Sequence, residues 1–299
     1  MKSGKLVRQF RIDKPEKFRL ADHDPTNCCG LDIEKGQAKA MLADGIKRLS
    51  DLQERLYAQD RWAVLAIFQA MDAAGKDSAI KHVMSGVNPQ GCQVHAFKAP
   101  SAEELDHDFL WRCAMRLPER GRIGIFNRSY YEEVLVVRVH PELLARQRLP
   151  EKVTGKEIWR RRFKSIRGFE RHLARNGVCV LKFFLNVSKE EQRRRFLDRL
   201  DEPAKRWKFS LGDVAERKLW DKYMEAYEDM IRATSSEESP WYVVPADNKW
   251  FARLAVSAAI IETLERLDLK FPVIKGPQLA ELKKVRGALL SEGTGRKRP

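Results

Sequence analysis

The chain has 299 residues, enough for one large α/β unit or for two small domains. Its 57 lysines and arginines exceed its 42 aspartates and glutamates, which gives a formal charge of +15. Polyanions are therefore its natural partners, although charge alone does not choose among nucleic acid, a membrane surface and a smaller polyanion. A generally soluble basic surface would give the same composition.

The sequence also argues against several classes of protein. It has no apolar run long enough to span a membrane and no N-terminal hydrophobic signal core, which predicts a cytosolic protein with no membrane partner. Its five cysteines are odd in number and lack metal-ligand spacing, so we expect reduced thiols. The histidines are scattered and no serine lies in a nucleophile elbow, so neither metal hydrolysis nor acyl transfer is indicated.

Charged residues, Pro15 and Pro25 fill the first thirty positions, and this composition predicts an arm outside the core. Apolar residues at helical spacing then predict a helix over residues 34–58. Five apolar segments predict buried strands at residues 62–68, 92–97, 122–126, 178–185 and 241–244. Helices are expected between them, with capping boxes at Ser101, Thr154 and Ser188, and single helices over residues 101–116, 154–175, 213–232 and 248–267.

This alternation predicts a doubly wound parallel sheet, with the ligand beyond the carboxyl ends of the strands. We expect an N-terminal arm and helix over residues 1–60 and a core over 61–270. A basic lid is predicted within the core at about residues 190–233. Residues 271–299 are expected to form a C-terminal helix and a basic tail, the last eight residues being disordered.

A loop of small residues follows the first predicted strand. Residues 69–78 read Gln-Ala-Met-Asp-Ala-Ala-Gly-Lys-Asp-Ser, and a helix can begin behind them. Small side chains let backbone N–H groups approach phosphate oxygens, a helix N-terminus favours negative charge, and a lysine can bridge two phosphates. The loop therefore predicts phosphate or nucleotide binding at Ala73, Ala74, Gly75, Lys76, Asp77 and Ser78.

The loop departs from the usual pattern Gly-x-x-x-x-Gly-Lys-Ser/Thr at two positions. Ala70 replaces the first glycine, and Asp77 replaces the metal-binding hydroxyl. A tight strand-to-helix turn with a solvated lysine is the alternative interpretation. The flanking strand and helix favour the phosphate site.

Two further motifs lie in the same order along the chain. Residues 126–132 read Phe-Asn-Arg-Ser-Tyr-Tyr-Glu, and residues 206–210 read Arg-Trp-Lys-Phe-Ser. Together with Met-Asp-Ala-Ala-Gly-Lys-Asp at residues 71–77, they resemble the polyphosphate kinase 2 family, whose members move phosphoryl groups between inorganic polyphosphate and nucleotides. The resemblance runs from about residue 30 to 268. It implies a P-loop kinase-like three-layer α/β/α sandwich with a central five-stranded parallel sheet and a helical lid.

Phosphoryl transfer depends on alignment and charge neutralisation, which suggests roles for the loop residues. Lys76 is expected to hold phosphates where donor and acceptor meet. Asp72 and Asp77 are candidate ligands of Mg²⁺, with Mn²⁺ as an alternative ion, because carboxylate oxygens suit such cations. The resemblance also associates Asp72 with the acceptor phosphate. Loop capping, or pairing with Lys76, is the alternative role of these aspartates.

The second motif has Asn127 where the family often has a metal-binding aspartate, which weakens the case for metal there. Arg128 can make a paired contact to phosphate oxygens that lysine cannot reproduce. The motif ending in Glu132 resembles that of the subgroup that accepts both AMP and ADP. Tyr131 is expected beside the nucleotide, although core packing is an equal alternative for both Tyr130 and Tyr131.

The basic stretch around residues 193–217 resembles the family's lid, which can close over a polyanion and exclude water. A solvated helix face of alternating charge is the alternative. The residues expected to bind polyphosphate there are Arg194, Arg199, Lys205, Arg206 and Lys208.

These motifs predict a Mg²⁺-dependent phosphotransferase that acts reversibly between inorganic polyphosphate and AMP, ADP and ATP. Asp72, Lys76 and Arg128 are the expected catalytic residues. The resemblance further implies a homo-oligomer, a dimer or a tetramer, and no specific nucleic acid is expected. Two alternatives remain: an ATP-dependent P-loop kinase of another small substrate, and a basic nucleic-acid-binding protein with a vestigial loop.

Overall fold

The computed structural model describes residues 7–30 and 35–294. Its centre is a parallel sheet with the strand order β2-β3-β1-β4-β5. All five strands form where the apolar segments predict them: β1 (Ala63–Gln69), β2 (Cys92–Ala96), β3 (Ile123–Asn127), β4 (Val178–Asn186) and β5 (Trp241–Pro245).

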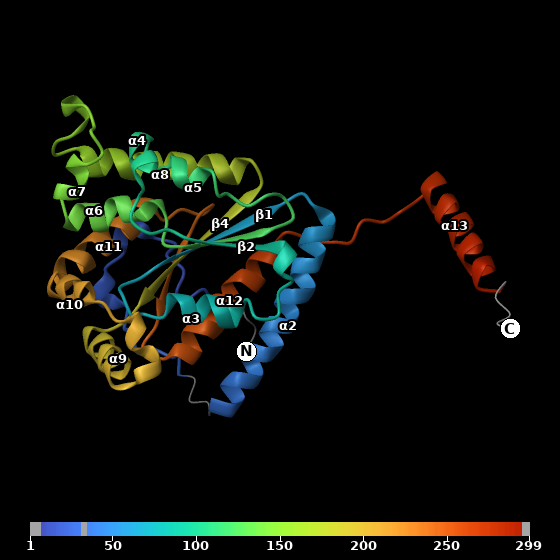
Figure 1. Ribbon diagram of the computed structural model, residues 1–299, viewed down its shortest axis with the longest axis horizontal. Coiled ribbons are helices and arrows are strands. Elements are labelled where there is room, and N and C mark those ends of the chain that lie inside the picture. Colours follow the sequence, from blue (N-terminus) through green and yellow to red (C-terminus); the bar gives the residue numbers. More distant parts are fainter. Residues whose placement is uncertain (1–6, 31–34, 295–299) are drawn as a thin grey trace.

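Helices cover both faces of this sheet, which gives the expected three layers (Figure 1). One layer contains α2 (Lys35–Gln59), α3 (Lys76–Val83) and α12 (Lys249–Arg266). The other contains α6 (Val136–Val139), α8 (Ile158–Arg175) and α11 (Trp220–Thr234). The remaining α-helices are α4 (Ala102–Asp106), α5 (Trp111–Ala114), α7 (Glu142–Ala145), α9 (Lys189–Asp201), α10 (Leu211–Lys218) and α13 (Pro277–Thr294).

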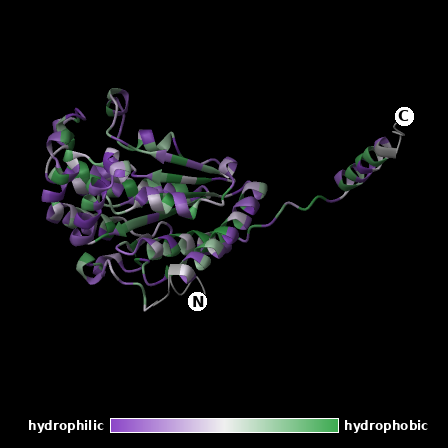
Figure 2. Cartoon of the chain, turned by 60° about the horizontal axis from the view of Figure 1, so that its bottom comes forward, coloured by the Kyte–Doolittle hydropathy of each residue, from purple (hydrophilic) through white to green (hydrophobic). Residues whose placement is uncertain are grey.

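The core strands are apolar because helices cover both of their faces. Every residue of β1 and β5 is buried, and β4 is buried from Val180 onward. Figure 2 shows this as hydrophobic colour along the strands of the sheet. The strands are parallel and in register, so the loops that follow β1 and β3 emerge side by side at one edge.

The N-terminal segment differs from the prediction of an arm outside the core. Five of its apolar side chains are buried, and its backbone pairs beside the edge strand β5. The Ile12 N–H donates to the Trp241 carbonyl at 2.9 Å, and the Val243 N–H donates to the Phe10 carbonyl at 2.8 Å. The segment thereby satisfies edge groups that would otherwise be unpaired. The buried side chains are Val7, Phe10, Ile12, Phe18 and Leu20.

The C-terminal helix α13 lies apart from the rest of the molecule, at the end of an extended segment (Figure 1). It reaches Thr294, so the first residues of the tail that was expected to be disordered are helical. Residues 295–299 of that tail lie outside the described residues.

Three expectations about helices are wrong. The single helix expected over residues 101–116 is split into α4 and α5, and the one expected over residues 213–232 is split at Leu219. The Thr154 hydroxyl donates to the Glu151 carbonyl instead of capping α8, which begins at Ile158. The N-caps at Ser101 and Ser188 are confirmed.

Within the described ranges, no helix has both the length and the apolarity needed to cross a bilayer. All five cysteines are free.

A buried polar network fastens the segment after β3 to the core. The Glu170 carboxylate on α8 accepts from Tyr130 Oη at 2.8 Å and from Tyr131 Oη at 2.7 Å. It also accepts from Lys182 Nζ at 2.6 Å and from Ser239 Oγ at 2.9 Å. Burial, and then the Glu170 charge, raise the pKa of both tyrosines well above the usual range, so both hydroxyls remain donors. The network thereby fixes the turn that carries Asn127 and Arg128.

Replacing Lys182 by Met should lower the free energy of unfolding by about 3–5 kcal/mol, because Glu170 would remain buried without a cation. Chemical denaturation measures this loss. The double variant Lys182→Met/Glu170→Gln should recover part of it, since a neutral amide oxygen can still accept from the tyrosines. A single variant as stable as the parent protein would contradict the assigned role of the pair.

Candidate functional site

The loops that follow β1 and β3 meet through a charged contact. Phe68 on β1 lies opposite Asn127 on β3. One residue later, the Arg128 N–H donates to the Phe68 carbonyl at 3.0 Å, and Arg128 Nη2 donates to Asp72 Oδ1 at 2.9 Å. The sheet register thus brings together two motifs that are far apart in sequence. Asp72 and Arg128, which join them, are 56 residues apart.

The first loop has the backbone of an anion cradle. Gly75 has φ 107°, in a region that favours glycine, and it caps the N-terminus of α3. Ala73 has φ 60°, a left-handed conformation that costs an alanine about 1–2 kcal/mol. The first N–H groups of α3 have no partners within the helix, and the residues that carry them line the cavity described below. The loop is therefore held in a conformation suited to binding phosphate.

Lys76 lies at the base of this loop. Its Nζ donates to the carbonyl of Ala70 at 2.8 Å and to that of Met71 at 3.4 Å. Burial, and then the nearby Arg128 charge, lower the pKa of Lys76 to about 8. The ammonium group has thus lost much of its hydration and gains from an arriving phosphate.

Arg128 is held in place by two carboxylates. Besides Asp72, it donates through Nη1 to Glu132 Oε2 at 3.1 Å. The charge of Glu132 raises the pKa of Arg128, and this effect outweighs the opposing effect of burial. The side chain therefore stays charged at all relevant pH values. Arg128 also has φ 64°, a second left-handed residue at the site. Strain of this kind is typical of positions where a side chain must be aimed.

Asp77 lies beside Asp72 on the opening turn of α3, and its Oδ1 accepts from Asn127 Nδ2 at 2.6 Å. Both carboxylates line the cavity described below, as does Ser78, whose Oγ accepts from Arg253 Nη2 at 2.8 Å. Within residues 7–30 and 35–294 there is no cluster of three or more acidic, histidine or cysteine side chains that could hold a metal alone. Magnesium commonly binds one or two carboxylates plus substrate phosphates, so the residues fit that ion. Asn127 supports Asp77 rather than replacing a carboxylate.

Arg195 on α9 is a site residue that the sequence reasoning did not select. It is buried, and its Nη1 donates to the carbonyls of Ala73 at 3.0 Å and Ala74 at 2.7 Å. Its Nη2 donates to the Ala246 carbonyl at 2.6 Å, beyond β5. Arg195 therefore braces the back of the first loop against the end of the sheet. Its pairing with Glu191 four residues earlier is the only sequence signal, and it does not distinguish a buried arginine from an exposed one.

These residues surround an open space of about 660 Å³, which we call the loop cavity. Basic side chains of residues 199–208, a part of the predicted lid, line its other side, and Trp207 in the same segment is 78% exposed. The cavity lining includes Asp72, Ala73, Gly75, Lys76, Asp77, Ser78, Asn127, Arg128, Arg199, Lys205, Lys208, Asp213 and Lys249.

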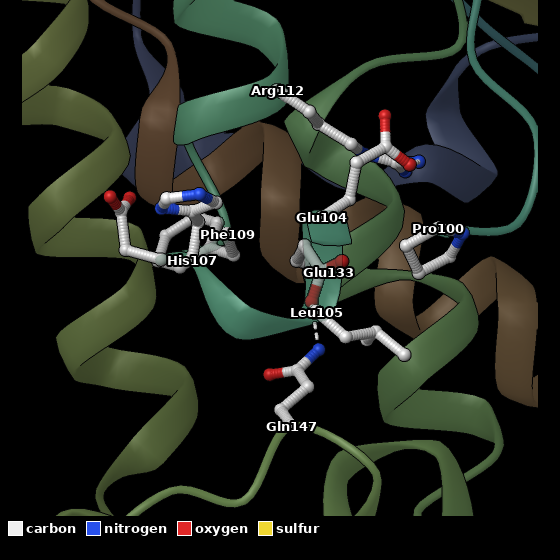
Figure 3. Close-up of a pocket in the computed structure, with 9 residues that line it drawn as sticks. Pro100, Glu104, Leu105, His107, Phe109, Arg112, Glu133 and Gln147 are labelled. Carbon is white, nitrogen blue, oxygen red and sulfur yellow. Dashed lines mark hydrogen bonds and ion pairs between the residues drawn. The ribbon is translucent and has the colours of Figure 1, made fainter. Parts of the chain in front are cut away.

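A second space of about 450 Å³, the side cavity, adjoins the loop cavity and shares Phe97, Lys98 and Arg128 with it. It is more apolar and includes Glu132, Val136, Val137 and Leu143. Its far wall continues into a recess of about 20 Å³, room for little more than one water molecule. Figure 3 shows that recess, with the Gln147 amide directed at the Glu133 carboxylate and Arg112 close to Glu104.

Four of the predicted site residues do not reach these cavities. Tyr131 is fully buried and donates to Glu170, so it supports the second motif from behind. Ala74 is buried and contributes its carbonyl to Arg195. Arg194 points outward and pairs with Glu191 at 2.7 Å, and Arg206 donates to the Leu200 carbonyl at 2.7 Å.

Comparisons with known proteins show to which family the chain belongs. The family pattern Polyphosphate kinase 2 (PPK2) matches residues 32–272. An ADP-polyphosphate phosphotransferase of Rhodopseudomonas palustris is 55% identical over 285 residues, which cover 95% of this chain and 98% of the relative. An AMP/ADP-polyphosphate phosphotransferase of Meiothermus ruber is 45% identical, covering 89% and 96% of the two chains.

A solved structure supports the same assignment. The crystal structure of polyphosphate kinase 2 from Arthrobacter aurescens TC1 superposes with a TM-score of 0.86 at 40% identity, covering 94% of this chain and 96% of that one. The chain therefore belongs to the polyphosphate kinase 2 family and is a polyphosphate-dependent nucleotide phosphotransferase.

Proposed function

We propose that the protein transfers phosphoryl groups reversibly between inorganic polyphosphate and both AMP and ADP, with Mg²⁺. The observation that carries this proposal is the meeting of Lys76, Arg128, Asp72 and Asp77 around one cavity, beneath a basic lid. Phosphoryl transfer needs aligned reactants and charge neutralisation more than covalent help, and these residues supply both.

The loop cavity suits the phosphates of the donor. Lys76 offers a buried ammonium group, and the N-terminus of α3 offers N–H groups and a favourable dipole. Lys205 and Lys208 on the lid face the same space. A polyphosphate chain can therefore lie between loop and lid with its terminal phosphate beside Arg128.

The side cavity suits the nucleoside of the acceptor. It is within the usual size range of small-molecule sites, it has an apolar wall, and it opens toward Arg128. The accepting oxygen of AMP and that of ADP must reach the same point, so the AMP nucleoside must lie one phosphate closer to it. The two connected cavities give room for both positions.

The named relatives differ on this point: one is called an ADP-polyphosphate and the other an AMP/ADP-polyphosphate phosphotransferase. The motif Asn-Arg-Ser-Tyr-Tyr-Glu at residues 127–132 resembles that of the subgroup that accepts both AMP and ADP, and this resemblance supports the broader acceptor range.

Asp72 and Asp77 would hold the magnesium ion together with substrate phosphates. When bound, the ion supplies neutralisation of the charge on the transferred group. The protein's own residues do the rest: Lys76 and Arg128 orient the phosphates, and the lid limits access of water.

Incubation with polyphosphate and AMP should yield ADP and then ATP, while polyphosphate and ADP should yield ATP directly. Chromatography of the nucleotides over time measures both. A parallel reaction with ATP as the sole donor tests the rival ATP-dependent kinase.

Turnover of ADP without turnover of AMP would remove AMP from the proposal. Exclusive use of ATP as donor would overturn the proposal as a whole. Binding of duplex nucleic acid with no nucleotide product would favour the nucleic-acid alternative.

Replacing Lys76 by Ala should lower kcat by about 10²- to 10³-fold, the scale for one charge-stabilising group at a reacting centre. Steady-state kinetics with saturating polyphosphate and ADP measures the loss. Lys81→Ala is the matched control, because Lys81 is an exposed lysine on the same helix. Equal rates for the two variants would refute the role of Lys76.

The activity should also depend on the charge of Lys76. Its pKa in the free protein is lowered to about 8, so kcat/KM should fall as pH rises through that value, by about tenfold per pH unit above it. Deprotonation removes the positive charge of the Lys76 ammonium group, which is the charge that would contact the phosphates. In Lys76→Arg the fall should disappear, whatever its absolute rate, since a guanidinium stays charged. A parent profile that is flat well above pH 8 would contradict this assignment.

A further inference from the structure

Helix α8 has a row of basic side chains along its exposed face. Arg160, Lys164, Arg167, Arg171 and Arg175 follow one another at spacings of three or four residues, which places them on one side of the helix. We call these five residues the basic stripe. All five are exposed.

The opposite side of α8 is buried against the sheet through Ile158, Ile166 and Leu173. The stripe therefore faces away from the core, and α8 lies along the outer edge of its layer (Figure 1). At 1.5 Å per residue, the stripe is about 22 Å long.

The stripe has almost no acidic counterpart. Arg160 pairs with Glu157, and the other four members have no ion pair with any residue that the structure describes. The one acidic residue within α8, Glu170, is buried and pairs with Lys182. Like charges three or four residues apart destabilise a helix by a few tenths of a kcal/mol each. A helix that needed only solubility would interleave acidic residues, so this face is suited to a polyanion.

One end of the stripe begins close to the site. Arg162 lies between Arg160 and Lys164 in sequence but points inward, where its Nη1 donates to the Glu133 carbonyl at 2.7 Å. Glu133 lines the side cavity. The stripe thus starts behind the wall of that cavity and runs away from it.

We propose that the basic stripe is a second binding surface for long inorganic polyphosphate, separate from the loop cavity. This inference rests on the proposed use of polyphosphate. A single row of cations matches a single chain of phosphates. The aromatic side chains of α8, Trp159, Phe163 and Phe169, are partly buried against the core, which leaves little of their surface for nucleic-acid bases to stack on. A chain held at the stripe keeps its free end at a high local concentration near the loop cavity.

The test replaces Lys164, Arg167, Arg171 and Arg175 by Gln in the full chain. The KM for a long-chain polyphosphate fraction should rise by about tenfold or more, because the second attachment is lost. The kcat, and the KM for a fraction too short to reach both surfaces, should stay unchanged. The control variant replaces Lys275, Lys283, Lys284 and Arg286, which are also exposed, and removes the same charge from the C-terminal region.

The proposal is overturned if the long-chain KM is unchanged, or if it rises equally in the control variant. A matching rise in the short-chain KM would also overturn it, because the stripe would then act on the site itself. Thermal unfolding checks that the stripe variant is folded, and removal of repulsion should leave its Tm unchanged or higher.

Direct binding of fluorescently labelled long-chain polyphosphate, without nucleotide, separates this proposal from the proposed function. If the protein turns over no polyphosphate, the proposed function fails. The second surface is still supported if the stripe variant binds labelled polyphosphate more weakly than the parent protein and the control variant does not. Unchanged polyphosphate binding with loss of duplex RNA binding would overturn it in favour of a nucleic-acid surface.

Discussion

The site depends on the contact between Arg128 and Asp72. Parallel pairing of β1 with β3 brings the ends of the two strands to the same edge, and the 2.9 Å contact then joins the loops that follow them. Glu132 holds the other side of the guanidinium, so Arg128 cannot turn away from the loop cavity. The buried network around Glu170 fixes the same turn from behind. Sheet register, ion pair and buried network therefore act on one residue.

Several features at this edge of the sheet lower the stability of the folded protein. Lys76 is buried at the cost of a lowered pKa, and both Ala73 and Arg128 have left-handed backbones. Arg195 compensates by bonding the loop carbonyls to the end of β5. The site therefore carries excess positive charge until phosphates bind. The protein as a whole also carries a net positive charge.

Local patterns predicted the strands and the loops well, since apolar runs ending in small or polar residues specify both. They could not predict contacts set by tertiary packing. Arg194 and Arg195 both lie one turn from Glu191, and only the rotation of α9 against the sheet buries the second. The burial of Tyr131 depends on Lys182 and Glu170, which come from other elements. The pairing of the N-terminal segment with β5 joins residues that are more than 200 positions apart, so local patterns could not predict it either. The homo-oligomer implied by the family resemblance stays a prediction.

In the proposed function, the loop around Gly75 holds the phosphates where donor and acceptor meet. The most direct measurement is a crystal structure of the protein with polyphosphate, Mg²⁺ and a nucleotide. We expect a chain of phosphates between this loop and the lid, with Lys76 and Arg128 on its terminal unit and the nucleoside in the side cavity. An empty loop, with both ligands bound elsewhere on the molecule, would contradict it.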